Sequence, residues 1–419
     1  MNDTAQESRG TFGIEAMDVY GGSASISAQA LFAGRGLDPQ RFDNVVLNRR
    51  AVALPFEDPV THAVNAARPL LDRIPRRDLD RIELLVTTTE SGIDYSKSVA
   101  TYVHEHLGLG RNCRLLEMKQ ACYSATGALQ LAVGQLAAGI SPGAKALIIS
   151  TDISLADERA QYAEPATGTG AVALLVGDRP RVLAVDLGAF GLYSFETLDS
   201  ARPLPDLDIA DADRSLLAYL ECLSHSFADY RTRVEGADFA TTFDHLALHT
   251  PFSGMVRAGH RRLMRELYGT SPKDIQNDYE RRVEPSLNYP GEVGNLFSGS
   301  LYLALASLID HVPLPGQTRV GLFSYGSGCS SEFFSGVLGP DSAAEVGRAR
   351  IRERLANRAE LTFAEYTELL PETLGCLRPV SDRMVDPAGY SAYLDRVVDR
   401  PKMLALTGVE GYHRRYEWI

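Results

Sequence analysis

The sequence predicts an α/β fold. Apolar runs of strand length alternate along the whole chain with amphipathic stretches of helix length, a pattern typical of strands and helices packed in layers. The expected order in the first half is strand, helix, strand, helix and then three strands. The second half follows a similar rhythm without repeating any residues, so only the order of elements indicates a duplication.

The first half is expected to form a largely central sheet. Short apolar runs bounded by turn residues predict strands at 82–89, 114–118, 145–151, 171–177 and 181–188. Two helices are expected between the first three strands. One covers 95–108 and ends at a glycine, and the other begins near Cys122 and closes at Gly139.

The second half is expected to contain three helices and two strands. The helices cover about 212–233, 254–267 and 295–310, and the strands are "FDHLALHT" and "RVGLFSYG". The segment from 341 to 375 is charged and is expected to be helical and superficial. The tail "YHRRYEWI" carries the only Trp, and no pattern places it.

Composition excludes several classes of protein. With 419 residues, 45% of them hydrophobic, the chain can bury a large core, and its net charge of −12 disfavours nucleic-acid binding and suits a soluble protein. No apolar run approaches the roughly 18 residues of a membrane span, and the polar N-terminus does not resemble a signal peptide. Five cysteines without paired spacing predict a reducing, cytoplasmic location. Neither disulfides nor a metal site is expected.

Cys122 is the first candidate for chemistry. It lies where "KQACYSATGALQLAVGQLAAG" turns from polar to apolar and helical, at the mouth of the expected helix. Unpaired N–H groups at a helix N-terminus stabilise a thiolate, so the pKa of Cys122 is expected to fall. The alternative is a small buried hydrophobic residue, which is what most free cysteines are.

Two further reactive side chains stand at the ends of expected strands. Glu90 follows "LLVTTT", and His249 closes "FDHLALHT". Chemistry in open α/β sheets gathers at the carboxyl ends of strands, and a thiol, an imidazole and a carboxylate together suit acyl transfer with carbanion chemistry. The spacing in the sequence cannot show whether Glu90, Cys122 and His249 lie close together. Two alternatives therefore remain: Glu90 is a solvated turn residue, and His249 is a core histidine.

Six ordered blocks resemble those of 3-hydroxy-3-methylglutaryl-CoA synthases. They are "TTTESGIDYSKSVATYVHEHLGL", "KQACYSATGALQLA", "AEPATGTGAVALLV", "HTPFSGMV", "GNLFSGSLYLAL" and "FSYGSG". The stretch "FDNVVLNRRAVALPFEDPVTHAVNAA" and the closing "YHRRYEW" are more similar to the branch of this family found in polyketide β-branching clusters. The resemblance covers about 16–338.

The resemblance implies a thiolase-like fold, a five-layer αβαβα sandwich of two related halves that is usually dimeric. With this fold, the expected divisions are a disordered lead-in at 1–13, an N-terminal half at 14–190, and a C-terminal half with a helical extension at 191–419. No bound cofactor or metal is implied.

The same resemblance implies roles for individual residues. Cys122 is the acylated nucleophile, Glu90 the general acid/base, and His249 the group that polarises the acceptor carbonyl. Asn295 and Ser327 match positions that line the acyl site, and Thr167 and Tyr325 are further substrate-binding candidates. For Asn295 the alternative is a turn or N-cap, and for Ser327 a flexible loop.

One departure from the family concerns the donor. Members that use free coenzyme A carry phosphate-binding lysines shortly after the histidine, where this chain has Gly254 and Ala258. A donor on an acidic carrier protein would need a local basic patch instead. Candidates at helical spacing are Arg257, Arg261, Arg262 and Arg265, with Arg35 as a weaker one; a solvated helix face is their alternative.

The resulting hypothesis is a carrier-protein-dependent enzyme. It would load acetyl from a donor acyl carrier protein onto Cys122 and add it to the β-keto group of a polyketide held on an acceptor carrier protein. Phosphopantetheine would come only with the carriers. The rival interpretations are the mevalonate-pathway enzyme acting on acetyl-CoA and acetoacetyl-CoA, which the missing lysines disfavour, and an inactive docking homologue. A thiolase or ketosynthase is a weaker match.

Overall fold

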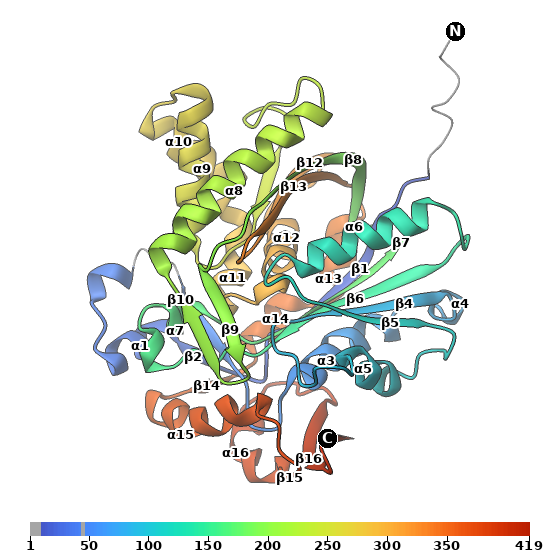
Figure 1. Ribbon diagram of the computed structural model, residues 1–419, viewed down its shortest axis with the longest axis vertical. Coiled ribbons are helices and arrows are strands. Elements are labelled where there is room, and N and C mark those ends of the chain that lie inside the picture. Colours follow the sequence, from blue (N-terminus) through green and yellow to red (C-terminus); the bar gives the residue numbers. More distant parts are fainter. Residues whose placement is uncertain (1–9, 43–46) are drawn as a thin grey trace.

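The computed structural model describes residues 10–42 and 47–419, and its core is a sheet of nine strands (Figure 1). The strands are β1 (Gly13–Tyr20), β4 (Ile82–Thr88), β5 (Arg114–Met118), β6 (Lys145–Asp152), β7 (Gly170–Gly177), β8 (Leu183–Ser194), β11 (His245–Leu248), β12 (Thr318–Gly326) and β13 (Ser330–Leu338). Their order in the sheet is β11-β12-β13-β8-β1-β7-β6-β4-β5. Only two residue pairs join β1 to β8, so the sheet consists of two blocks.

Helices cover both blocks and fill the space between them. They are α3 (Pro59–Asp72), α5 (Val99–Leu107), α6 (Ser124–Ala137), α8 (Ala212–Arg233), α9 (Ser253–Tyr268) and α12 (Ser300–His311). One core packs α6 and α12 between the blocks, a second packs α3 and α5 outside the β4–β7 block, and a third packs α8 and α9 outside the β11–β13 block. These layers form the αβαβα sandwich that the family resemblance implies.

The alternation of side chains along the strands produces this layering. In β7, Leu174 faces the central helices, whereas Leu175 faces the outer layer of α3 and α5. Successive residues of a strand point to opposite faces, and both faces of these strands are covered, which explains their nearly continuous apolar runs. The central α12 is buried from Ser300 to Ile309, so truncating one of its leucines to alanine should cost about 2–5 kcal/mol.

Several predicted bounds agree with the structure and others move. The strand at 114–118 and the helix at 212–233 have the predicted ends. Helix α5 begins at Val99 because the Ser98 side chain caps it, and the helix expected from 295 begins only at Ser300, after a 3-10 turn. Of the predicted lead-in, residues 1–9 lie outside the described residues. The expected division after residue 190 falls inside strand β8.

The segment from 341 to 375 was predicted to be helical and superficial, and the second part of this prediction is wrong. It contains α13 (Ser342–Gly347), α14 (Ile351–Ala356), β14 (Ala359–Leu361) and α15 (Phe363–Leu374). Strand β14 pairs in parallel with β2 (Ala24–Ser27), which pairs with β3 (Arg49–Val52). The charged residues of this segment alternate with apolar residues that are fully buried, among them Ile351 and Tyr366.

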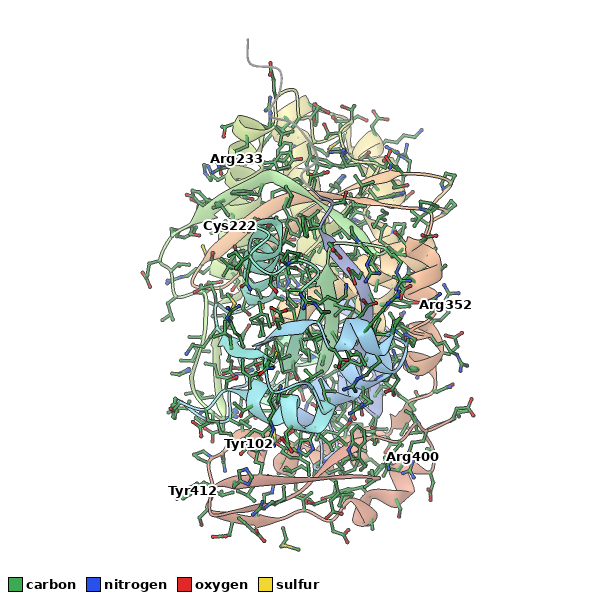
Figure 2. All side chains as sticks on the ribbon, turned by 90° about the vertical axis from the view of Figure 1, so that its right-hand side faces the viewer. Tyr102, Cys222, Arg233, Arg352, Arg400 and Tyr412 are labelled. Atoms are coloured by element: carbon green, nitrogen blue, oxygen red, sulfur yellow. The ribbon has the colours of Figure 1, made fainter. Side chains whose placement is uncertain are left out.

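The C-terminal tail forms a small sheet beneath α3 and α5. Strand β16 (Leu404–Glu410) pairs with β15 (Asp382–Met384) and with β17 (His413–Trp418). Arg414 and Tyr416 both donate hydrogen bonds to Asp58, the residue that caps α3. Tyr102 of α5 stacks on His413, and Figure 2 shows Tyr102 close to this sheet. The tail is therefore anchored to the first half of the chain.

Shorter elements complete the chain. They are α1 (Ala28–Arg35), α4 (Arg76–Leu79), α7 (Ala163–Ala166), β9 (Ser200–Leu204), β10 (Leu207–Ala210), α10 (Pro272–Arg282), α11 (Asn288–Val293) and α16 (Ser391–Leu394), with six 3-10 turns between them in the described chain. Within residues 10–42 and 47–419, no helix is both long enough and apolar enough to cross a membrane.

Candidate active site

Neighbouring strands bring Glu90 and Cys122 together. Strands β4 and β5 run parallel, with Thr88 beside Met118, so both chains leave the sheet at the same edge. The Cys122 thiol donates a hydrogen bond to Oε1 of Glu90, with Sγ and Oε1 3.2 Å apart. The thiol and the carboxylate are thus in direct contact, which their spacing in the sequence could not establish.

Asp152 is a third member of this site that the sequence analysis missed. Its Oδ1 accepts hydrogen bonds from the Glu90 backbone N–H (2.8 Å), the Ser91 hydroxyl (2.9 Å) and the Thr89 hydroxyl (3.1 Å). Asp152 ends strand β6, so the rule that singled out Glu90 at a strand end also applied to it. We call Glu90, Cys122 and Asp152 the nucleophile corner.

The prediction that the pKa of Cys122 falls is wrong. Burial raises the pKa of this thiol well above its usual value, and the adjacent Glu90 carboxylate raises it further. Helix α6 begins at Ser124, two residues after Cys122, and the thiol contacts the Glu90 carboxylate. The resting nucleophile is therefore a thiol with a carboxylate as its hydrogen-bond acceptor.

Burial also shifts the two carboxyl groups of the corner. It raises the pKa of Glu90, while the nearby Arg202 guanidinium opposes this shift. Burial and the charge of Glu90 raise the pKa of Asp152 well above its usual range. Two carboxyl groups in one enclosed site both hold their protons more tightly than they would in water, which suits Glu90 to a role in proton transfer.

Close packing fixes the turn that carries Cys122. Ala121 has a φ of 44°, in the left-handed region, and Tyr123 donates a hydrogen bond to Glu332 of β13 at 2.8 Å. A Cβ atom on Gly326, at the end of β12, would lie 2.5 Å from the Gln120 carbonyl oxygen. Glycine at 326 therefore lets the end of β12 pack directly against the nucleophile turn.

His249 lies at the end of β11, beside that same strand. Its backbone N–H donates to the Phe323 carbonyl at 2.8 Å, and its carbonyl accepts a hydrogen bond from the Tyr219 hydroxyl at 2.9 Å. Burial lowers the pKa of the imidazole to about 3, so the ring is neutral at physiological pH. Its Nδ1 is buried and has no hydrogen-bond partner within the described chain.

Tyr325 and Ser327 lie on the strand end that packs against the nucleophile turn. The rings of Tyr325 and His249 are 6.4 Å apart, and the Tyr325 hydroxyl donates to the buried Asp199. Asp199 also accepts a hydrogen bond from the Gly328 backbone N–H at 2.9 Å. It therefore binds Tyr325 before Ser327 and Gly328 after it. Ser327 is thus placed by its neighbours, and Asp199 is a second residue that sequence reasoning missed.

Asn295 and Thr167 lie beside each other in the fold. Their backbones pair through the Asn295 N–H to the Ala166 carbonyl (2.9 Å) and the Gly168 N–H to the Asn295 carbonyl (3.0 Å). The Asn295 side-chain oxygen accepts from Phe297 N–H and the Ser300 hydroxyl, which is the turn role of the alternative interpretation. The Asn295 side-chain oxygen is therefore engaged in this turn.

The predicted docking arginines differ in their surroundings. Arg257, Arg261 and Arg265 are exposed and lie four residues apart on α9, which starts four residues after His249. Arg262 pairs with Glu266 at 2.6 Å. We call these four arginines the basic face of α9.

Arg35 does not fit the docking interpretation. Its guanidinium makes two hydrogen bonds, at 2.8 and 2.9 Å, to the fully buried carboxylate of Glu164, and only 15% of its side chain is exposed. A guanidinium engaged in this way is an internal ion pair rather than a free surface charge. No local pattern in the sequence indicated Glu164 as its partner.

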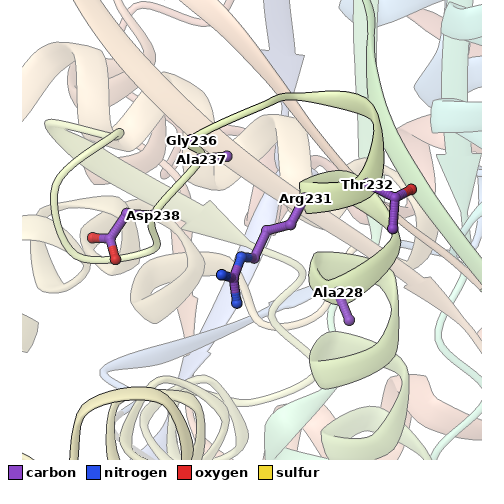
Figure 3. A pocket seen from close by; sticks show the side chains of 6 residues that line it. All are labelled: Ala228, Arg231, Thr232, Gly236, Ala237 and Asp238. Carbon is purple, nitrogen blue, oxygen red and sulfur yellow. The ribbon is translucent and has the colours of Figure 1, made fainter.

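Among the described residues, no group of three or more His, Cys, Asp or Glu side chains is placed to hold a metal ion. A hollow of about 400 Å³ lies elsewhere, at the end of α8, and Arg231 and Asp238 are among its lining residues (Figure 3). None of the site residues described above lines it.

Two family models match the chain. The model of the hydroxymethylglutaryl-coenzyme A synthase N-terminal region matches residues 11–180, and that of the C-terminal region matches residues 265–375.

Individual relatives are similar over nearly the full length. The chain is 45% identical to PksG of Bacillus subtilis, a polyketide biosynthesis 3-hydroxy-3-methylglutaryl-ACP synthase, over 97% of this chain and 99% of the relative. It is 34% identical to a hydroxymethylglutaryl-CoA synthase of Enterococcus faecalis, over 87% of this chain and 92% of the relative. A crystal structure of the curacin biosynthetic pathway HMG synthase in complex with apo donor-ACP superposes with a TM-score of 0.94 at 45% identity, covering 98% of this chain and 100% of that one.

Proposed function

The chain belongs to the hydroxymethylglutaryl-coenzyme A synthase family, and from this premise we propose that it is a β-branching enzyme of polyketide biosynthesis. It takes an acetyl group from a donor acyl carrier protein and adds it to the β-keto group of an intermediate on an acceptor carrier protein. The contact between Cys122 Sγ and Glu90 Oε1 at 3.2 Å carries this proposal, because it joins the nucleophile to its acid/base group.

The first step is acylation of Cys122. The sulfur attacks the acetyl thioester carbon, the bond to the carrier's pantetheine sulfur breaks, and the proton of the Cys122 thiol ends on that leaving sulfur. Because the pKa of Cys122 is raised, the proton must be removed as the attack proceeds. Glu90 already accepts the thiol's hydrogen bond and is the base in reach.

The second step forms the carbon–carbon bond. A base removes a proton from the methyl group of the acetyl-cysteine, the resulting carbanion attacks the β-keto carbon, and the new alkoxide takes up a proton. Glu90 lies within reach of the acetyl methyl group because it contacts the sulfur that carries it. The neutral His249 can donate a hydrogen bond to the acceptor carbonyl, with Asn295, Thr167, Tyr325 and Ser327 lining the acyl site. Water then cleaves the Cys122 thioester and leaves a carboxymethyl branch.

The form of the donor follows from two positions on α9. Gly254 and Ala258 stand where family members that use coenzyme A carry lysines, so the charges that would hold nucleotide phosphates are missing. We place donor docking on the basic face of α9 and leave Arg35 out of it. Similarity at 45% identity to a synthase named for an ACP substrate supports this over the mevalonate interpretation. The paired Glu90 and Cys122 disfavour an inactive homologue.

The chain is also proposed to act as a homodimer without a resident cofactor. Within the described chain, β5 is the last strand of the sheet and has an open edge, and Leu116 on it is 51% exposed. Leu131 of α6 is 67% exposed nearby in the fold. An open edge with exposed apolar residues favours pairing with a second copy. Light scattering should give twice the chain mass; a monomer at micromolar concentration would contradict the dimer.

Two further features remain proposals. Phosphopantetheine enters only as the arm of the carrier proteins. The five free thiols suit a reducing compartment, so we propose the cytoplasm.

Intact-protein mass spectrometry tests the proposed reaction. Incubation with an acetyl-loaded donor carrier protein should add one acetyl group to the enzyme, and Cys122→Ala should abolish this adduct. Cys113→Ala is the matched control, because Cys113 is a half-exposed thiol whose pKa is raised to about 11 by burial. An adduct that persists in Cys122→Ala and disappears in Cys113→Ala would assign the nucleophile elsewhere.

A further inference from the structure

The hairpin of β9 and β10 lies apart from the main sheet but touches the nucleophile corner. In the described chain its two strands pair only with each other. At its turn, Asp206 forms an ion pair with Arg378 at 2.6 Å. From the middle of β9, Arg202 reaches into the site. The hairpin is therefore attached to the body by two arginines with different surroundings.

Arg202 connects the hairpin to the backbone that carries Glu90. Its Nη1 donates to the Glu90 carbonyl at 3.3 Å and to the Ser91 hydroxyl at 2.8 Å, and its Nη2 donates to the Ile153 carbonyl at 3.4 Å. These acceptors follow strands β4 and β6, so one guanidinium joins the two loops of the corner. Only 7% of the Arg202 side chain is exposed, although it belongs to a surface hairpin.

Arg202 is also the cation that faces several acidic groups. Glu90 is surrounded by the Cys122 thiol, by Asp152 at the end of β6, by Asp199 before β9, and by Asp208 on β10. Arg202 forms an ion pair with Asp208 at 2.6 Å within the hairpin. Its positive charge lowers the pKa of Glu90, whereas burial and the negative charges of Asp208 and Asp199 raise it.

We propose that Arg202 is a positioning residue for Glu90: its guanidinium fork fixes the loop at Glu90 and Ser91 and keeps a positive charge beside the nucleophile corner. This inference rests on the proposed function, since it concerns the base of the condensation step. A guanidinium suits both tasks, because its planar fork can bind two loops and an aspartate together and it keeps its charge at every physiological pH.

The test is the pH dependence of condensation in Arg202→Gln. Enzyme is first loaded with acetyl and then mixed with acetoacetyl-loaded acceptor carrier protein, and a single turnover is followed by mass spectrometry between pH 5 and 9. Removing the positive charge raises the pKa of Glu90, so the acid limb of the rate profile should move to higher pH. At the acid end the rate should fall about tenfold, as expected for one lost charge-assisted contact.

Two variants separate charge from structure. Arg202→Lys keeps the charge but loses the fork, so its acid limb should stay close to that of the wild type while its rate falls at every pH. Arg378→Gln is the matched control: it releases the turn of the same hairpin without touching Glu90, and its acid limb should not move. If Arg202→Gln does not fold, Asp208→Asn tests the same idea with opposite sign, because losing a negative charge should move the limb to lower pH.

The outcomes distinguish this inference from the proposed function. An acid limb that moves in Arg202→Gln, while Cys122 still loads, supports the inference. A rate that falls equally at every pH in Arg202→Gln, with an unmoved limb, would overturn it and leave the proposed function intact. Failure of the wild-type enzyme to load acetyl would instead contradict the proposed function.

Discussion

The nucleophile corner and the basic face of α9 differ in burial: the reactive groups of the corner are enclosed, whereas the charges of α9 face solvent. In the corner, Cys122 and Glu90 are enclosed, in contact and shifted in pKa by burial. On α9, Arg261 and Arg265 are exposed and carry their charge into solvent. Bond-making chemistry needs fixed distances and a low dielectric, whereas recruiting a charged partner needs a reachable surface. Changes in the two regions should therefore have effects of different kinds and sizes.

The largest effect is expected from Glu90→Gln. The substitution keeps the shape of the side chain but removes its proton-transfer function, so condensation should slow by about 10² to 10⁴-fold. Loading of Cys122 should slow less than condensation, because loss of the Glu90 carboxylate removes the base but also removes a charge that raises the pKa of the Cys122 thiol. Single-turnover kinetics with preloaded acetyl-enzyme measures the condensation step alone.

The control for this prediction is Glu117→Gln. The Glu117 carboxylate also has a pKa raised by burial, but it accepts a hydrogen bond from the Val99 N–H at the start of α5 rather than from Cys122. It should leave condensation nearly unchanged. An undiminished condensation rate in Glu90→Gln would contradict the acid/base role and leave Glu90 as a residue of the turn only.

The next effect concerns stability around the corner. Burial raises the pKa of Glu332, which accepts a hydrogen bond from Tyr123, to about 7 from an ordinary value of 4.5. Between these two pH values the folded state therefore binds more protons than the unfolded state. The protonated Glu332 carboxyl thus stabilises the folded state fully below pH 4.5, and this contribution is lost as the pH rises toward 7.

Glu332→Gln should remove this dependence. Between pH 4.5 and 7, the free energy of unfolding of the wild type should fall relative to that of the variant. The fall should be at most about 1.4 kcal/mol for each pH unit. Denaturant unfolding at several pH values measures the difference. A difference that stays constant with pH would mean that this carboxyl titrates alike in both states. Replacing Arg261 by Gln, by contrast, should change stability by no more than about 0.5 kcal/mol at any pH.

The smallest effect is expected on α9. Reversing Arg261 and Arg265 to Glu should slow loading from the donor carrier protein about tenfold and leave loading from acetyl-CoA nearly unchanged, because only the carrier needs this surface. Added salt should slow loading of the wild type and have less effect on the variant. The matched control reverses Arg76 and Arg77, two exposed arginines of α4. Equal slowing by both pairs would assign the effect to net charge rather than to a docking site.

The sequence predicted elements well where local signals agreed. Helix α8 has its predicted ends because the Asp211 side chain caps its first turn and its apolar positions recur at helical spacing. The segment 341–375 was misjudged as superficial because its charged residues alternate with apolar ones that pack against distant elements, such as β14 against β2. Pairing between residues more than 300 positions apart leaves no local trace.

The site was predicted residue by residue but not in its electrostatics. Glu90 and Cys122 stood out at the ends of elements, and parallel pairing of β4 and β5 then brought them into contact. The direction of the Cys122 pKa was predicted wrongly, because the helix-terminus argument ignored burial beside a carboxylate. Arg202 gave no signal at all, since its importance depends on where an isolated hairpin folds.

The central claim is that acetyl reaches Cys122 on a carrier protein. The most direct measurement is a side-by-side loading time course with acetyl carrier protein and acetyl-CoA at equal concentrations, read by intact-protein mass spectrometry. With Gly254 and Ala258 in place of two phosphate-binding lysines, each contact being worth roughly 1.5–3 kcal/mol, acetyl-CoA should load Cys122 about a hundredfold less efficiently. Equal efficiency from acetyl-CoA and from every carrier tested would contradict the account and return the chain to the mevalonate interpretation.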